Sequence, residues 1–394
     1  MKKSFHAPIV GLMIFLTFIS AFPPLSTDLY LPAMPHMGEQ LNADAAKVQW
    51  TLSGFMFSFA LSMLLWGPLS DRYGRRPILL CGSALFVLAS VMAAISFNLE
   101  MLIVSRSLQG AGSAALSTTA MAIVKDRFAA HRMEKMLALM QTFIVLAPML
   151  APIVGAAMLL VTSWRGIFWV LAACGVLAFV GGLFFKESLK KPLNGAWYHS
   201  LGRIVVVFQN KGFARLLLLF SAMAMPFMAY LAVSSYIFQD IFHLSAQTFG
   251  FFFAATAGVS MLGAIVYIKF LRHFSRYFLL LGVFVSVALA GLCLIFFGKL
   301  NLWLFTFLTM TISFACSASR APATVLMLSQ LENDSGTVSA LIGSFAFLFG
   351  ALSMFLCSLP WPNLIVAYGS ISCILGVFAS IVWIILNQYQ LFKH

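Results

Sequence analysis

Long apolar segments separated by short polar ones run along the whole chain. Twelve of them are long enough to cross a bilayer as a helix, which needs about 20 predominantly apolar residues. They lie near residues 8–34, 48–68, 78–98, 101–124, 136–160, 166–185, 216–240, 246–268, 278–298, 302–326, 337–358 and 363–386. They are too long for strands and lack a two-residue alternation, which excludes a β-barrel. The pattern predicts an all-α integral membrane protein with about twelve transmembrane helices.

A longer basic stretch containing proline and glycine divides these segments into two sets of six. We expect an N-terminal six-helix bundle over 1–185, a cytoplasmic connecting loop over 186–215 and a C-terminal six-helix bundle over 216–394. Repeated halves are a common transporter plan. A shift of 200 residues also aligns Arg72, Arg76, Leu79, Leu80 and Gly82 with Arg272, Arg276, Leu279, Leu280 and Gly282. This trace favours two pseudo-symmetric bundles, although chance agreement of such common residues would also produce it.

The composition narrows the class further. Apolar residues make up 62% of the chain and charged residues 9%, whereas soluble domains carry about 25% charged residues. Soluble enzymes, disordered scaffolds and nucleic-acid binders are therefore excluded. Of the 24 Lys and Arg residues, 19 fall in segments that share one side with the N-terminus, and the opposite loops hold only Lys47, Arg165 and Lys299. The positive-inside rule then predicts that both termini are cytoplasmic. The net charge of +13 sets topology and does not indicate a polyanion partner.

The loop after the second apolar segment carries a dense motif. It contains Gly67, Asp71, Arg72, Gly74, Arg75 and Arg76. Its spacing is similar to the signature G-x-L-x-D-R-x-G-R-R/K of the major facilitator superfamily. The glycines permit close backbone approach and turn geometry, and the aspartate can pair with arginines. The resemblance implies a cytoplasmic conformational latch between the two halves. A plain positive-inside loop would explain the arginines alone.

Three other stretches of the N-terminal half also match patterns of that superfamily. The fourth segment has Arg106, Gln109 and Gly110 in the spacing R-x-x-Q-G. The fifth has Pro148, Pro152 and Gly155, which resembles the exporter-associated pattern G-x-x-x-G-P-x-x-G-G with three glycines replaced by alanine. A kinked packing helix, compatible with an importer, is the alternative for this segment.

In the first segment, residues 26–35 look like the S-x-D-M-Y-L-P-A-x-P stretch of the Bcr/CflA drug-resistance branch. This resemblance implies a monomeric bacterial inner-membrane protein with twelve spans. It would export chloramphenicol- or bicyclomycin-like compounds in exchange for protons. A dedicated exporter of an endogenous metabolite such as a siderophore is the alternative, and a proton-coupled uptake symporter is a weaker one.

Asp28 and Arg106 are the main charges inside the first six segments. A charge at the bilayer centre costs about 2.5–3.5 kcal/mol on insertion scales and therefore usually has a function. Each lies about six residues, or roughly 9 Å, from the outer end of its helix, so a direct or water-mediated pair is possible. We hypothesise that Asp28 takes up a proton from outside and that Arg106 promotes its release inward. The alternative is that either residue reaches the aqueous rim and only snorkels.

Other polar residues in the apolar segments are candidates for a substrate cavity. They are Tyr30, Gln109, Gln141 and Arg320. Arg320 follows a serine-rich stretch and is expected either to contact an anionic or polar substrate group, or to snorkel or pair with Glu332 or Asp334.

Several other chemistries lack support in the sequence. There is no G-x-x-x-x-G-K-[ST] motif for ATP hydrolysis, and the six cysteines are dispersed without metal-ligand spacing. We therefore expect no enzymatic activity, no metal and no cofactor, with the proton gradient as the energy source. The expected partners are a small-molecule substrate, protons and the lipid bilayer, without nucleic acid.

Overall fold

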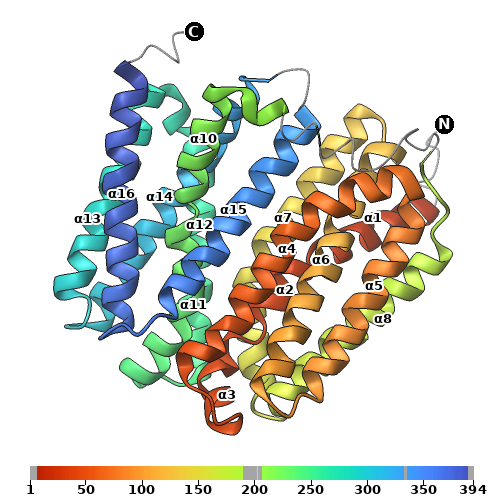
Figure 1. Cartoon of the computed structure of the whole chain (residues 1–394), viewed down its shortest axis with the longest axis horizontal. Coiled ribbons are helices and arrows are strands. Elements are labelled where there is room, and N and C mark those ends of the chain that lie inside the picture. The colour runs from red at the N-terminus through yellow and green to blue at the C-terminus, as the bar shows by residue number, and fades with distance from the viewer. Residues whose placement is uncertain (1–6, 190–201, 203–205, 332–334, 389–394) are drawn as a thin grey trace.

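The computed structural model describes residues 7–189, 202, 206–331 and 335–388, and all the regular structure in these ranges is helical. The N-terminal half contains α1 (Ala7–Ser20), α2 (Phe22–Asp28), η1 (Leu31–Ala33), α3 (Met34–Gln40), α4 (Ala45–Tyr73), α5 (Arg75–Ala94), α6 (Leu99–Arg127), α7 (Ala130–Met158) and α8 (Trp164–Phe184). The C-terminal half contains α10 (Lys211–Ala222), α11 (Met225–Tyr236), η2 (Ile237–Ile241), α12 (Ala246–Lys269), η3 (Leu271–His273), α13 (Arg276–Phe297), α14 (Leu302–Leu328), α15 (Ser335–Cys357) and α16 (Leu364–Gln388). Figure 1 shows the two halves as neighbouring bundles.

The expected number of spans is confirmed over the described residues. Eleven helical segments are long and apolar enough to cross a membrane. The twelfth span is α6, whose 29 residues include five charged ones and are therefore less apolar. Some helix bounds differ from the prediction. α4 extends to Tyr73, α7 begins at Ala130, and α10 begins at Lys211, so residues 211–215 belong to a helix and not to the connecting loop.

The first span of each half is interrupted. In the N-terminal half the helix breaks at Ala21, before the prolines at the start of α2, and again after Asp28. In the C-terminal half it breaks between α10 and α11, just before Pro226. Proline lacks the N–H that would continue the helical ladder. Interrupted spans at corresponding positions of two halves mark the binding region in many transporters, so these breaks direct attention to the centre of each bundle.

Two helix pairs join the bundles. The second span of the first half, α4, packs against the fifth of the second half, α15, and α7 packs against α12 in the reciprocal arrangement. This exchange of equivalent partners is what a pseudo-two-fold axis produces. It agrees with the pseudo-symmetric bundles expected from the sequence.

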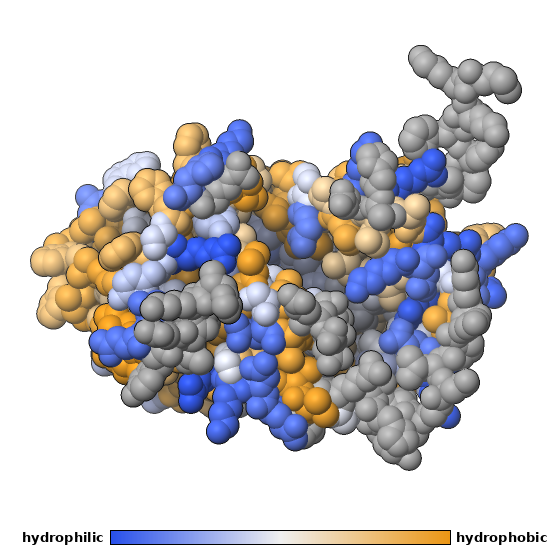
Figure 2. Space-filling model, turned by 90° about the horizontal axis from the view of Figure 1, so that it is seen from above, coloured by the Kyte–Doolittle hydropathy of each residue, from blue (hydrophilic) through white to orange (hydrophobic). Residues whose placement is uncertain are grey.

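The two faces of the molecule differ in how tightly the bundles meet. At the face away from the termini, hydrogen bonds cross between bundles from Ser235 Oγ to the Leu31 carbonyl (2.6 Å) and from Gln239 Nε2 to the Pro32 carbonyl (3.0 Å). Trp50 Nε1 also donates to Ser358 Oγ (2.9 Å). The opposite face, at which α1 begins and α16 ends, is hollowed between the bundles (Figure 2). The conformation is therefore open toward the side of the termini.

Candidate functional site

Asp28 is the last residue of α2 and is 2% exposed. Its Oδ1 accepts a hydrogen bond from Thr27 Oγ1 at 2.9 Å. The three ion pairs among the described residues do not include it. A carboxyl group thus lies inside the N-terminal bundle at a helix break, with a hydroxyl as its partner and without a paired cation in the described part of the chain.

The hydroxyl of Thr27 has other acceptors within reach. The carbonyl oxygens of Pro23 and Pro24 each lie 3.1 Å from Thr27 Oγ1. One hydroxyl proton is available for these three acceptors. The Thr27 side chain can therefore respond to the charge of Asp28 without moving the backbone.

Arg106 on α6 is 0% exposed and lies in an aromatic cage. Its guanidinium carbon is 4.4 Å from the ring centre of Tyr30, 4.5 Å from that of Phe55 and 5.7 Å from that of Phe168. Nη1 donates to Gln109 Oε1, whereas Nε and Nη2 have no hydrogen-bond partner among the described residues. Aromatic faces attract a cation most strongly when water is excluded, so the cage supplies part of the stabilisation that a carboxylate would give.

The structure does not bring Asp28 and Arg106 into a direct ion pair. The link between them is Tyr30, which follows Asp28 by two residues, places its ring on Arg106 and directs its hydroxyl to Thr51 (3.2 Å). Tyr30 and Gln109 were expected to line a substrate cavity. Both are fully buried around Arg106, because the aromatic and amide groups solvate the buried guanidinium.

Two glycines set the positions of these buried groups. A Cβ atom on Gly110 would overlap the carbonyl of Phe55 on α4, and one on Gly155 would overlap the carbonyl of Leu29, next to Asp28. The R-x-x-Q-G glycine thus brings α6 onto the ring that cages Arg106. Gly155 in the same way brings α7 onto the break in the first span. Close backbone approach of this kind is typical of small residues in membrane helices.

The remainder of the proline-containing motif packs at the interface between the two bundles. Pro148 and Pro152 both lie inside α7, which is one helix from Ala130 to Met158. Gly250 of α12 packs against the backbone of Pro152 and Ile153. The motif therefore lies between the break in the first span and the opposite bundle.

A cavity of about 190 Å³ lies in the C-terminal bundle. Its hydroxyl-bearing lining residues are Ser221, Ser260, Ser313, Ser317, Ser319 and Thr324. Its larger apolar lining residues include Phe220, Met223, Phe227, Met228, Met327 and Phe347. Arg320 also lines it and is an exposed residue, and its role stays a prediction. Gln141 lies exposed on α7 and is not among the lining residues of this cavity.

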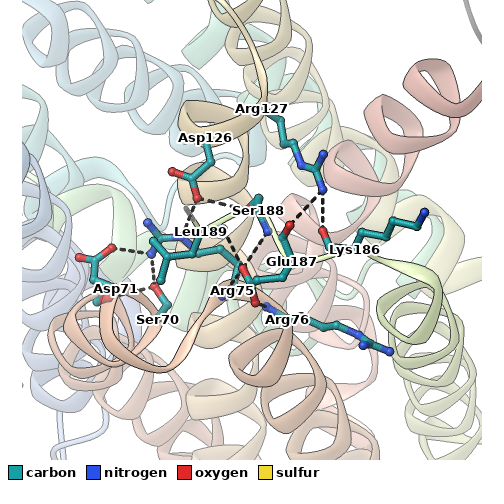
Figure 3. A network of polar contacts seen from close by, with 11 residues as sticks. Ser70, Asp71, Arg75, Arg76, Asp126, Arg127, Lys186, Glu187, Ser188 and Leu189 are labelled. Atoms are coloured by element: carbon teal, nitrogen blue, oxygen red, sulfur yellow. Dashed lines mark hydrogen bonds and ion pairs between the residues drawn. The ribbon is translucent and has the colours of Figure 1, made fainter. Parts of the chain in front are cut away.

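The loop motif builds a polar network at the termini side of the N-terminal bundle (Figure 3). Arg75 pairs with Asp71 through Nη1 and with Asp126 through Nε (2.9 Å), and it also donates to Ser70 (2.8 Å). Arg76 Nη2 donates to the carbonyl of Leu183 (2.8 Å). All of these partners belong to the N-terminal bundle, so the contacts of this conformation do not join the two halves. The latch role stays a prediction.

Glu187, just after α8, accepts hydrogen bonds from backbone N–H groups of this network. Its Oε1 accepts from Arg75 N (3.0 Å), Ser188 N (2.8 Å) and Leu189 N (2.9 Å), and its Oε2 accepts from Arg76 N (3.0 Å). Partial burial alone would raise the pKa of Glu187, but these four hydrogen bonds outweigh it and lower the pKa. The carboxylate is therefore held in its ionised form.

The two motif glycines behave differently. Gly74 has φ +103°, and a Cβ there would collide with Glu187 Oε2. Because Gly74 precedes α5 and has no side chain to cap it, Glu187 caps the helix from a distance. Gly67 has no atom within 4 Å of its Cβ position, so the close approach expected there is not made. Arg72 lies over the ring of Tyr73 at 5.3 Å.

Several participants were not predicted from the sequence. Asp126 and Glu187 join the loop network, and Phe55, Phe168 and Ser90 complete the surroundings of Arg106 and Gln109. The sequence did offer a signal for Asp126 and Glu187. The chain has only 11 Asp and Glu residues, and these two stand beside basic residues at the ends of predicted helices. The cage aromatics gave no such signal among 40 phenylalanines.

Twelve spans in two related bundles, interrupted helices at their centres and buried ionisable groups define a polytopic membrane transporter. The sequence profile of the Major Facilitator Superfamily matches residues 13–354. The chain belongs to this superfamily of secondary transporters, whose members are not enzymes.

The chain is also similar to individual relatives along most of its length. It is 29% identical over 357 residues to the uncharacterized MFS-type transporter YdgK of Bacillus subtilis (strain 168), covering 87% of each chain. It is 25% identical over 338 residues to multidrug resistance protein D of Escherichia coli (strain K12), covering 85% of each. Among solved structures, a bacterial homologue of the human lysosomal transporter Spinster superposes with a TM-score of 0.73 at 13% identity, covering 98% of this chain and 97% of that one. This last likeness concerns the fold alone.

Proposed function

We propose that this protein exports small molecules, including chloramphenicol- or bicyclomycin-like antibiotics, from the cytoplasm in exchange for protons. The protein would lie in the bacterial inner membrane, with both termini in the cytoplasm. Relatives named multidrug resistance proteins support export. The observation that carries the proton coupling is Asp28, a buried acid at a helix break without an ion-pair partner among the described residues.

The proposed cycle begins with the cavity open to the cytoplasm. Substrate enters the hollow between the bundles while Asp28 is ionised and accepts the hydroxyl proton of Thr27. After the protein reorients, Asp28 takes up a proton from the outside. Its charge disappears, and Thr27 can then donate to the carbonyl of Pro23 or Pro24. Return to the inward-open state releases this proton to the cytoplasm.

The contacts of α7 connect the proton site to the bundle interface. Gly155 rests on the carbonyl next to Asp28, and the backbone at Pro152 rests on Gly250 of α12. A small change at the break in the first span therefore reaches the opposite bundle through packed backbone. Packed interfaces tend to switch between discrete arrangements, which suits alternating access.

The test is a drug-susceptibility panel in an efflux-deficient bacterium. Wild type, Asp28→Asn and Asp44→Asn are compared at equal membrane expression. Asp44 is the matched control, since its side chain is 79% exposed and pairs only loosely with Lys47 (3.7 Å). We expect wild type and Asp44→Asn to raise resistance to at least one compound and Asp28→Asn to lose it.

Three outcomes contradict the proposal. Unchanged resistance in Asp28→Asn removes the proton role of Asp28. A flat panel with an extracellular metabolite lost on deletion of the gene indicates a dedicated exporter. Increased sensitivity and greater accumulation of a compound on expression indicate uptake.

A further inference from the structure

The cavity of the C-terminal bundle has one cationic group in its lining, Arg320. None of the ion pairs among the described residues includes this arginine. Glu332 and Asp334, the acids considered as partners from the sequence, lie outside the described residues. Arg320 is about eight residues before the end of α14, or roughly 12 Å inside the helix end. A guanidinium is thus presented to a cavity within the membrane-spanning part of the protein.

The same face of α14 carries further polar groups toward this cavity. Ser313, Ser317 and Arg320 follow one another at intervals of four and three residues, which places them on one side of a helix. The Oγ of Ser313 is fully buried and has no hydrogen-bond partner among the described residues. A buried polar atom left without a partner is costly, which makes it a marker for a ligand or an ordered water.

A helix break also borders the cavity. Met223 and Ala224, between α10 and α11, both line it. Pro226 has no N–H, so the carbonyl of Ala222 lacks its regular helical donor. By the 200-residue repeat, this break corresponds to the one at Ala21, just before the prolines of α2. Irregular backbone at membrane depth is tolerated where it lines a cavity.

The remaining lining is apolar and adaptable. Phenylalanine and methionine side chains from α10, α11, α14 and α15 face the space beside Arg320. Such surfaces suit apolar bodies of varied shape. A cation beside an apolar wall is complementary to a molecule that carries one negative charge at the end of an apolar ring or chain.

We infer that this cavity is a binding site for an amphipathic organic monoanion, whose carboxylate pairs with Arg320 and whose apolar body lies among the Phe and Met side chains. A planar guanidinium can bind a carboxylate through two parallel hydrogen bonds. A single arginine balances one negative charge, and a cationic ligand would be repelled. As a statement about the transported substrate, the inference rests on the proposed export function.

The binding test uses 2-naphthoate and its neutral isostere 2-naphthamide. Their dissociation constants are measured by titration calorimetry on the full-length protein in nanodiscs of phosphatidylcholine alone, so that no anionic lipid competes. We expect the protein to bind naphthoate at least about tenfold more tightly than naphthamide, as one charge-assisted pair allows. Arg320→Gln should abolish this preference while still binding naphthamide, and Arg320→Lys should retain part of it. Arg276→Gln, an exposed arginine at the start of α13, is the matched control and should behave as wild type.

A second measurement leaves Arg320 intact. Thr324→Cys places a thiol one helical turn from Arg320 in the cavity lining. Naphthoate should slow its alkylation, and naphthamide at the same concentration should not. Equal binding of the two probes, or a naphthoate preference that survives Arg320→Gln, overturns the inference. So does a preference that appears only in Glu332→Gln/Asp334→Asn, because Arg320 would then be neutralised internally.

The resistance panel separates this inference from the proposed function. Drug export that depends on Asp28, together with equal binding of naphthoate and naphthamide, contradicts the anion site alone. A flat panel with a clear naphthoate preference contradicts drug export and supports the anion site.

Discussion

The α-carbon of Gly155 lies directly against the backbone carbonyl of Leu29, leaving no room for a Cβ atom. This contact joins α7 to the first span at the residue that follows Asp28. The family-like motif of the fifth span therefore packs against the helix that carries Asp28 in this conformation. Its prolines leave α7 continuous, and its glycine permits the contact.

Gly155→Ala should destabilise the protein or change its resting conformation. The added methyl overlaps backbone and not a flexible side chain, so we expect a cost of about 1–3 kcal/mol, as in other overpacked sites. The loss of stability is measured by thermal unfolding in detergent. The effect on transport is measured as drug resistance at equal expression. Gly282→Ala on α13, where no atom lies within 4 Å of the Cβ position, is the control. Equal melting temperatures and resistance in the two variants would show that the Leu29 contact is dispensable.

The sequence predicted much of this fold because hydropathy and charge asymmetry act over whole helices. All twelve expected spans correspond to observed helices, and Asp28 and Arg106 are indeed buried. The partners of those two residues were not predictable. Whether Arg106 meets a carboxylate or aromatic faces depends on helix rotation, and Phe55 and Phe168 come from other helices.

Gln109→Leu should destabilise the protein, because Gln109 helps to stabilise the buried charge of Arg106. It removes the hydrogen-bond acceptor of Nη1 and leaves the guanidinium with aromatic faces alone. We expect a loss of stability of about 1–3 kcal/mol, the cost of an unsatisfied buried group. The double variant Arg106→Met/Gln109→Leu should recover that stability, because an apolar pair of similar volume replaces a buried polar one.

Thermal unfolding and drug export are measured together for these variants. The double variant should be stable yet inactive if Arg106 has a function in transport. Gln388→Leu, at the exposed end of α16, is the control. A Gln109→Leu protein as stable as this control would contradict the role of Gln109, and full export by the double variant would contradict the role of Arg106.

Ser235→Ala/Gln239→Leu should weaken closure of the face away from the termini. These side chains donate to the carbonyls of Leu31 and Pro32 across the bundles. Each bond contributes about 0.5–1.5 kcal/mol, so the ratio of the open to the closed form of that face should rise roughly 5- to 160-fold.

Spin labels at Phe97→Cys and Leu300→Cys, both on exposed loop positions, report this change in a background without native cysteines. Pulsed dipolar spectroscopy should reveal a new longer-distance component in the double variant. Ser286→Ala, which loses a bond within α13 only, should leave the distances unchanged. Identical distance distributions in all proteins would contradict the closing role of Ser235 and Gln239.

Long-range capping explains why part of the loop network escaped prediction. The motif glycines and arginines are contiguous in sequence, but Asp126 and Glu187 come from the ends of α6 and α8. Gly74 has the positive φ that the motif implies, whereas Gly67 makes no close contact in this conformation. Sequence spacing therefore predicted the turn, and only the packing of three helices revealed its cap.

Glu187→Gln should lower the melting temperature at neutral pH, because a neutral amide replaces the carboxylate that caps α5. The hydrogen bonds lower the pKa of Glu187 in the folded protein. Its contribution is therefore complete above the unfolded pKa of about 4.3 and is lost as the pH falls through the lower folded value. Since Glu187 is exposed, screening should keep the effect below about 1 kcal/mol, or roughly 1 °C for a chain of this length. Melting curves between pH 7 and pH 3 should show the gap between wild type and variant closing below about pH 4.3. Glu39→Gln, an exposed acid on α3, is the control, and a gap that persists unchanged at pH 3 would contradict the carboxylate cap.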